Sequence, residues 1–200
     1  MSKNKLNAYI LVDRSGSMIS RWDETLGSIN AYADQLTKDK AKGNITVACF
    51  DDVSFDVLRD KQKINEWNDI TNDEASPRGM TPLFDSINKI VTMAEDADKE
   101  KTVITILTDG AENCSKEITK EQAKSLVDRC KKRGWEVLFL GADFDAFNES
   151  DAVGISMSKT LNINSGNYGA SLRNIASKTA VYASSSNAPI NFTDEDRENA

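Results

Sequence analysis

Short apolar runs alternate with amphipathic segments along most of this chain, and this alternation limits the fold more than any other feature of the sequence. Residues Ala8–Val12 and Thr102–Leu107 have the composition of strands that are buried on both faces of a parallel sheet. Between such runs, apolar residues recur every three or four positions, as in Trp22–Lys38, which predicts helices. Strands that alternate with helices form right-handed β-α-β units. The sequence therefore predicts an α/β fold with a doubly wound, mostly parallel sheet.

The other segments extend this sheet to about six strands with helices on both faces, which is a Rossmann-like arrangement. Residues Val53–Leu58 alternate apolar and polar side chains after a short turn, and this predicts an antiparallel edge strand. Thr81 followed by Pro82 predicts an N-cap and the start of a helix. The remaining expected strands are 44–50, 135–141 and 160–163, and the remaining expected helices are 119–134, 146–152 and 168–183.

The length of 200 residues suits one ordinary domain. A serine-rich run at 184–187 is typical of a domain exit, so we expect the domain to comprise residues 1–187. Residues 188–200 are acidic and are expected to form a flexible, solvated tail.

Charge and missing residue types exclude several classes of function. The formal net charge is −7 without a basic run, which argues against nucleic-acid and anionic-membrane partners. The chain has no histidine, so Ser-His-Asp and Cys-His catalysis and histidine-rich zinc sites are excluded. The three cysteines lack the spacing of zinc or redox sites and are expected to be free thiols in a reducing compartment. The first apolar run is too short for a signal peptide or a membrane span, so we expect a cytoplasmic protein.

Oxygen-bearing side chains follow the predicted strands, at the edge where open parallel sheets bind ligands. Within the D-x-S-G-S loop after the first strand, Gly16 lets the backbone bend so that alternate residues point the same way. Hard oxygen donors suit Mg²⁺, Mn²⁺ or Ca²⁺ rather than zinc, and no sulfur joins them unless Cys114 reaches in. The candidate metal ligands are Asp13, Ser15, Ser17, Thr81 and Asp109.

On these residues the chain resembles the von Willebrand factor type A domain family, over roughly residues 7–185. The DxSxS element of the family matches Asp13–Ser17, its isolated threonine matches Thr81, and its later aspartate matches Asp109. The stretches 77–83, 108–113 and 134–142 are similar to small stand-alone bacterial and phage members. The resemblance implies that the five candidate ligands form a metal-ion-dependent adhesion site for Mg²⁺, with Mn²⁺ or Ca²⁺ as alternatives.

The function that the resemblance implies is a metal-dependent protein-binding module and not an enzyme. In such a module, an Asp or Glu of a partner protein completes the coordination of the cation. One alternative is a Mg²⁺-dependent phosphohydrolase, against which stand the lack of histidine and of a second aspartate in the Asp13 loop. The other alternative is a scaffold subunit with a vestigial metal site.

Overall fold

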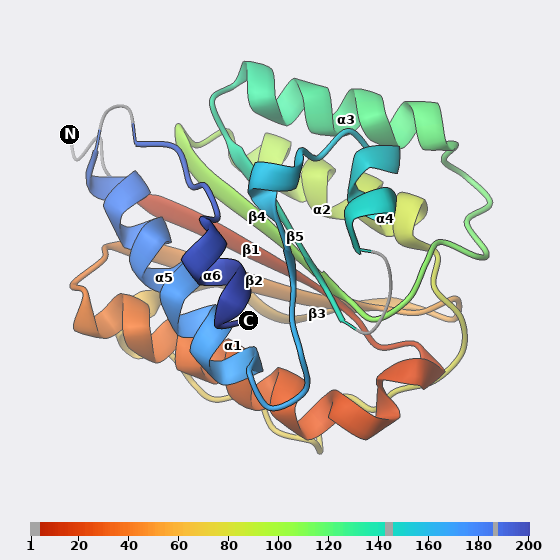
Figure 1. Ribbon diagram of the computed structural model, residues 1–200, viewed down its shortest axis with the longest axis horizontal. Helices are drawn as coiled ribbons and strands as arrows, with labels where there is room; N and C mark the ends of the chain where they lie inside the picture. Colours follow the sequence, from red (N-terminus) through yellow and green to blue (C-terminus); the bar gives the residue numbers. More distant parts are fainter. Residues whose placement is uncertain (1–4, 143–145, 186–187) are drawn as a thin grey trace.

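The central strand of the sheet is β1 (Leu6–Asp13), which pairs in parallel with β2 (Gly43–Phe50) on one side and with β4 (Lys101–Thr108) on the other. The computed structural model describes residues 5–142, 146–185 and 188–200. Within these residues the sheet has six strands in the order β3-β2-β1-β4-β5-β6, and only the β2–β3 pair is antiparallel (Figure 1). The other strands are β3 (Phe55–Lys63), β5 (Glu136–Gly141) and β6 (Thr160–Asn162). The predicted doubly wound sheet with one antiparallel edge strand is confirmed.

Helices cover both faces of the sheet, as Figure 1 shows. On one face lie α1 (Trp22–Lys38), α5 (Tyr168–Ser184) and α6 (Asp194–Glu198), and on the other α2 (Leu83–Ala97), α3 (Lys120–Lys132) and α4 (Ala146–Ala152). The short 3-10 helices are η1 (Gly16–Arg21), η2 (Ile64–Glu66) and η3 (Met157–Lys159). Because successive strand residues point to opposite faces, Ile10 packs into the core under α1 and α5, while Tyr9 and Leu11 pack under α2 and α3. In the part of the chain that is described, no helix combines the length and the apolar character needed to cross a membrane.

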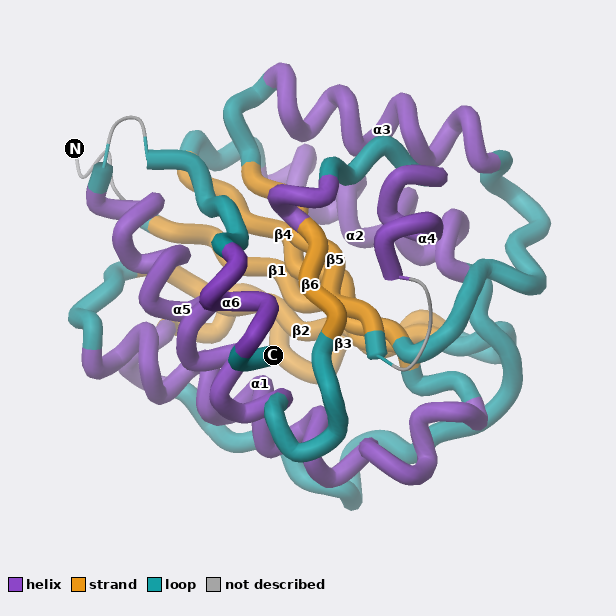
Figure 2. Tube along the Cα trace, viewed as in Figure 1, coloured by secondary structure: helices purple, strands orange, loops and turns teal. Residues whose placement is uncertain are grey.

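Strand order reverses at β1, because β2 and β3 extend the sheet on one side and β4, β5 and β6 extend it on the other. The strands β1 and β4 are parallel and pair Val12 with Leu107, so their carboxyl ends at Asp13 and Thr108 are adjacent (Figure 2). In open parallel sheets this reversal point is where ligands bind. The topology therefore places Asp13 and the residue that follows Thr108 at the reversal point of the sheet.

The edge strand β3 differs from its sequence prediction. We expected it over Val53–Leu58, whereas it runs from Phe55 to Lys63. An edge strand is less buried than a central strand and can therefore carry polar side chains. The polar residues 59–63 continue the pairing with β2, across two register shifts. Lys61 lies at this irregularity with a left-handed backbone, at φ 47°. The alternation of apolar and polar side chains stops before the strand does, so this pattern does not predict where the strand ends.

The segment 188–200 packs against the domain, which differs from the solvated tail that we expected. Ile190 and Phe192 are buried and join the core on the α1 and α5 face. The acidic residues that suggested a tail instead form α6, which begins with a capping box between Thr193 and Asp196. The domain therefore extends beyond the boundary that the serine-rich run suggested.

Asp196 holds α6 against α5. Its carboxylate accepts a hydrogen bond from Asn174 Nδ2 at 2.5 Å and lies 3.0 Å from Lys178 Nζ. Burial alone would raise the pKa of Asp196, but bonds from the Thr193 backbone N–H, Asn174 and Lys178 lower this pKa from 3.8 to about 2. We therefore expect Asp196→Asn to lower the free energy of unfolding at pH 7 by about 1–2 kcal/mol.

This loss should depend on pH, because stability from a lowered carboxyl pKa is present above 3.8 and disappears as the pH falls toward 2. Chemical denaturation should therefore show a difference between wild type and Asp196→Asn that shrinks from about pH 4 to about pH 2. Asp194→Asn, which changes an exposed carboxylate of the same helix, is the control and should cost less than about 0.5 kcal/mol. A difference that stays constant over this pH range would contradict the role given to Asp196.

Candidate metal centre

The five candidate ligands converge at the carboxyl edge of the sheet. Asp13 is the last residue of β1, and Ser15 and Ser17 follow in the next loop and the first turn of η1. Asp109 directly follows β4, and Thr81 lies two residues before the first residue of α2. Three segments that are distant in sequence, around residues 13–17, Thr81 and Asp109, thus meet at one place.

Asp13 is fully buried and is held by donors from three segments. Its Oδ1 accepts the backbone N–H of Ser15 at 2.7 Å. Its Oδ2 accepts the Thr108 hydroxyl at 2.6 Å and the Thr81 hydroxyl at 3.5 Å. Because Thr108 ends β4, the short bond joins the carboxyl ends of the two central strands.

Two serine hydroxyls connect the Asp13 loop to Asp109. The Oγ atoms of Ser15 and Ser17 lie 3.0 Å apart, and the Ser17 hydroxyl donates to Asp109 Oδ1 at 2.6 Å. Ser15 is buried and Ser17 is exposed, so this path runs from the interior to the surface. The cluster therefore opens to its surroundings on the side of Ser17.

Two further residues border the cluster. Arg21, at the end of η1, places its Nε 3.4 Å from Asp109 Oδ2. Gly110 also faces the cluster, because a Cβ at this position would lie 3.6 Å from Thr81 Oγ1 and 3.9 Å from Ser17 Oγ. A larger residue in place of Gly110 would narrow the space between these hydroxyls.

The charge of Asp13 is poorly compensated in the protein alone. Burial raises the pKa of Asp13 from 3.8 to about 6, the hydrogen bonds from Thr108 and Ser15 lower this pKa, and the negative charge of Asp109 adds to the rise. In the described part of the chain, the donors that reach Asp13 are neutral hydroxyl and amide groups. A cation near both carboxylates would offset burial and repulsion together.

The donor set at this edge fits a hard divalent cation. Two carboxylates and three hydroxyls offer only oxygen, which Mg²⁺, Mn²⁺ and Ca²⁺ prefer. Among the residues that the structure describes, no group of three or more His, Cys, Asp and Glu side chains is placed to hold a metal. Burial raises the pKa of Cys114 to about 11, which keeps its thiol protonated at neutral pH and makes it a poor ligand. The chemistry is therefore that of a mixed carboxylate and hydroxyl site.

Thr81 does not cap α2, which corrects the N-cap role expected from the sequence. The first amide groups of α2 bond to a different loop: Phe84 N–H donates to Glu112 Oε2 at 2.9 Å and to Ser115 Oγ at 3.1 Å. The backbone N–H of Thr81 donates to Asn113 Oδ1 at 2.9 Å. Because Glu112 and Ser115 cap the helix, the Thr81 hydroxyl is left to face the cluster.

An ion-pair network that is centred on the buried pair Arg14 and Asp51, and that the sequence did not reveal, joins the loops around the cluster. Arg14 is buried, with its Nε 2.6 Å from Asp51 Oδ2 and its Nη2 2.6 Å from Asp56 Oδ2. Arg78, in the loop before α2, places its Nε 2.8 Å from the same oxygen of Asp51. Burial alone would raise the pKa of Asp51, but two backbone N–H groups of the β2–β3 turn and the two arginines hold this pKa below its usual value.

The loop before α2 is also fixed through its backbone. Gly16 N–H donates to Gly79 O at 3.1 Å, and Met80 N–H donates to Asp52 Oδ1 at 2.7 Å. Gly79 has φ 67°, and a Cβ there would lie 2.0 Å from Asp52 Oδ1, so the position requires glycine. These contacts hold Thr81, which lies two residues after Gly79, against the end of β1.

Comparison with protein families agrees with the fold. A family model described as the von Willebrand factor type A domain matches residues 7–196. A comparison with curated protein sequences finds no match.

Solved structures with a similar fold include proteins from a mussel, from Plasmodium vivax and from Lactobacillus rhamnosus GG. Proximal thread matrix protein 1 from the mussel byssus matches with a TM-score of 0.62 at 16% identity, over 90% of this chain and 46% of that one. The manganese-loaded TRAP protein of Plasmodium vivax matches with a TM-score of 0.62 at 16% identity, over 88% of this chain and 75% of that one. The open form of the pilus adhesin SpaC from Lactobacillus rhamnosus GG matches with a TM-score of 0.70 at 12% identity, over 90% of this chain and 30% of that one. This chain thus spans about half of the mussel protein and about a third of SpaC, and the likeness establishes the fold.

We expect Asp51→Ala to lower the free energy of unfolding by about 3–5 kcal/mol, because it leaves the buried Arg14 without its main partner. Asp56→Ala is the matched control. Asp56 pairs with the same arginine, but its side chain is 47% exposed, so its loss should cost about 1 kcal/mol or less. Chemical denaturation measures both values, and equal losses would show that Asp51 is not the centre of the network.

Proposed function

Because the chain belongs to the von Willebrand factor type A family, we propose that it is a metal-dependent protein-binding module. The family commonly mediates metal-dependent interactions between proteins. The observation that carries the proposal is the hydrogen-bonded path from buried Asp13 through Ser15 and Ser17 to Asp109. The proposed ligands of the cation are Asp13, Ser15, Ser17, Thr81 and Asp109.

The two kinds of donor have different parts in this proposal. Asp13 and Asp109 supply two negative charges, which match one divalent cation. Ser15, Ser17 and Thr81 supply oxygens without further charge. When bound, a divalent cation supplies a coordination position outside these five residues, which a carboxylate of a partner protein takes.

Burial decides the side from which a partner approaches. Asp13 and Thr81 are buried, whereas Ser17 is exposed. The short bond from Thr108 holds the Asp13 carboxylate in place, and the bond from Asn113 holds the Thr81 backbone. The partner therefore meets the site over Ser17, on a rigid floor formed by the ends of β1 and β4.

We propose Mg²⁺ as the physiological ion, with Mn²⁺ and Ca²⁺ as alternatives. The similar fold of the manganese-loaded Plasmodium vivax protein supports a divalent cation in this architecture. The protein ligands would be the same for all three ions, so the choice rests on cavity size and on the number of water ligands.

We propose binding rather than catalysis as the activity. The chain has no histidine to act as a base near neutral pH. Ser15 stands where a D-x-D phosphotransferase would need its acid. The intervening Arg14 is buried against Asp51 and is not directed at a substrate. These features favour the module over the phosphohydrolase alternative.

The proposed partner is a protein in a reducing compartment, which we take to be the cytoplasm. Cys49, Cys114 and Cys130 are free thiols, and two of them are buried. The net charge of −7 disfavours nucleic acid and anionic membranes as partners. An acidic partner residue also meets this unfavourable overall field, so contact at the site itself must supply the attraction.

Mg²⁺ should stabilise the wild-type chain but not the Asp13→Asn or Asp109→Asn variants. A ligand that binds only the folded form at 100 times its Kd adds about 2.7 kcal/mol to the free energy of unfolding. Thermal unfolding with Mg²⁺, with Mn²⁺ and with EDTA measures this shift. Asp151→Asn removes an exposed carboxylate of α4 and should keep the full shift. A shift of the same size in the two site variants would refute the proposed ligands.

Partner binding and Mg²⁺ binding should be cooperative, because each raises the affinity for the other by the same factor. For a partner isolated in the presence of Mg²⁺, calorimetry should give a Kd in EDTA that is at least tenfold higher than the Kd in Mg²⁺. A tenfold difference corresponds to a coupling free energy of about 1.4 kcal/mol. Thr81→Ala should weaken binding less than Asp109→Ala, because it removes an uncharged donor. Equal affinity with and without metal would instead support a scaffold role.

A further inference from the structure

Three large apolar side chains are exposed around the candidate metal centre. Ile19 is 69% exposed, Val53 is 68% exposed and Met80 is 47% exposed. They come from η1, from the β2–β3 turn and from the loop before α2. We call these three residues the apolar rim.

Backbone contacts show that the three loops of the apolar rim are neighbours. Gly16, which begins η1, donates its N–H to Gly79 O at 3.1 Å. Met80 follows Gly79 and donates its N–H to Asp52 Oδ1 at 2.7 Å. Val53 follows Asp52 in the β2–β3 turn. Each rim residue therefore either takes part in one of these two hydrogen bonds or lies within three residues of one that does.

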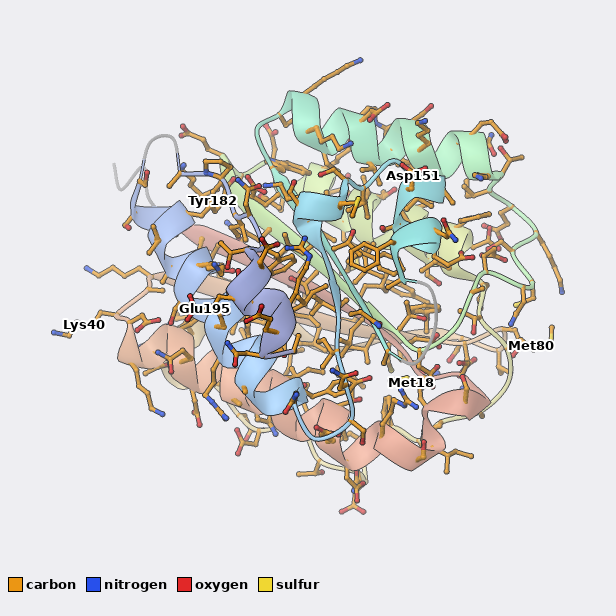
Figure 3. The ribbon with its side chains drawn as sticks, viewed as in Figure 1. Met18, Lys40, Met80, Asp151, Tyr182 and Glu195 are labelled. Carbon is orange, nitrogen blue, oxygen red and sulfur yellow. The ribbon has the colours of Figure 1, made fainter. Side chains whose placement is uncertain are left out.

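Neighbouring apolar side chains differ in exposure at the rim. Met18, beside Ile19, is fully buried, and Figure 3 labels Met18 and Met80 on the same, right-hand side of the molecule. Among the described residues, the other large exposed apolar side chains are Val57, Met157 and Val181, which lie on β3, η3 and α5. Exposed apolar side chains that gather around a site indicate a protein contact.

The charge at the centre selects an acidic group. Asp13 and Asp109 together balance the charge of one divalent cation, and the guanidinium of Arg21 lies 3.4 Å from Asp109 at the same centre. An acidic side chain suits this centre, while apolar side chains suit its border.

We propose that the apolar rim docks a loop of a partner protein that carries an acidic side chain between apolar ones. This inference rests on the proposed function, since it specifies the partner of the same site. Apolar contacts at Ile19, Val53 and Met80 supply affinity that does not depend on the unfavourable net charge of the chain. The acidic side chain enters at the centre, over Ser17.

Synthetic nine-residue peptides with a central Asp test the proposal. One set has Leu and Met beside the Asp, the second has Ser, and the third repeats the first with Asn in place of Asp. The wild-type chain in Mg²⁺ should bind the first set at least tenfold more tightly than the second, and should not bind the third. EDTA should abolish binding of the first two sets.

A rim variant and a matched control distinguish docking at the apolar rim from nonspecific binding to exposed apolar side chains. The rim variant carries Ile19→Ser, Val53→Ser and Met80→Ser, and should lose the preference for apolar flanks while keeping its Mn²⁺ affinity and thermal midpoint. The control carries Met157→Ser and Val181→Ser, which remove side chains that are 66% and 56% exposed elsewhere, and should bind like wild type.

The outcomes distinguish this inference from the proposed function. EDTA-sensitive binding that ignores the flanking residues and is unchanged in the rim variant would overturn the inference and leave the metal-dependent module standing. Failure of every Asp-centred peptide to bind in a metal-dependent way would count against the proposed function itself. Sedimentation of the chain alone in Mg²⁺ should give a monomer, and a dimer that the rim variant abolishes would assign the rim to a second copy and overturn the proposal.

Discussion

Asp13 ends the central strand with its carboxylate out of contact with water, and the surrounding loops are arranged about that buried charge. A second buried carboxylate, Asp51, lies in the neighbouring β2–β3 turn, where Arg14 and Arg78 meet it directly. The donors that reach Asp13 in the described residues are instead neutral, and its pKa is raised to about 6 while that of Asp51 is lowered. The contrast explains why we propose a cation at Asp13: the fold supplies arginines for Asp51, whereas the described donors to Asp13 are neutral.

Much of the fold could be predicted because burial leaves a pattern in the sequence. The strands β1 and β4 are continuous apolar runs, and their parallel pairing brings the residues after them to one edge. The convergence of Asp13, Thr81 and Asp109 follows from that topology, while their binding of metal stays a prediction. The pairing of Arg14 with Asp51 could not be predicted, because nothing in a single sequence says which of many charges meet across 37 residues. The packed segment after residue 187 was missed for the same reason, since Asn174 and Lys178 compensate the acidic Asp196.

At this edge of the sheet, the strand ends and the loops differ in their contacts and in their exposure. The ends of β1 and β4, joined through Thr108, and the network around Asp51 form a fixed floor. Above this floor, the loops present exposed Ser17 and the apolar rim of Ile19, Val53 and Met80. Because loops tolerate substitution better than strands, such a design lets the partner specificity change without disturbing the proposed ligands. The order of the strands places the candidate ligands, and in our proposal the loops determine the partner.

The central claim is that a divalent cation binds between Asp13 and Asp109. The most direct measurement is anomalous diffraction at the manganese absorption edge from crystals of the chain grown with MnCl₂. We predict one strong anomalous peak within coordinating distance of both carboxylates and of the hydroxyls of Ser15, Ser17 and Thr81, directly or through water. Density without a peak at this position, or a peak only at carboxylates elsewhere on the surface, would contradict the account.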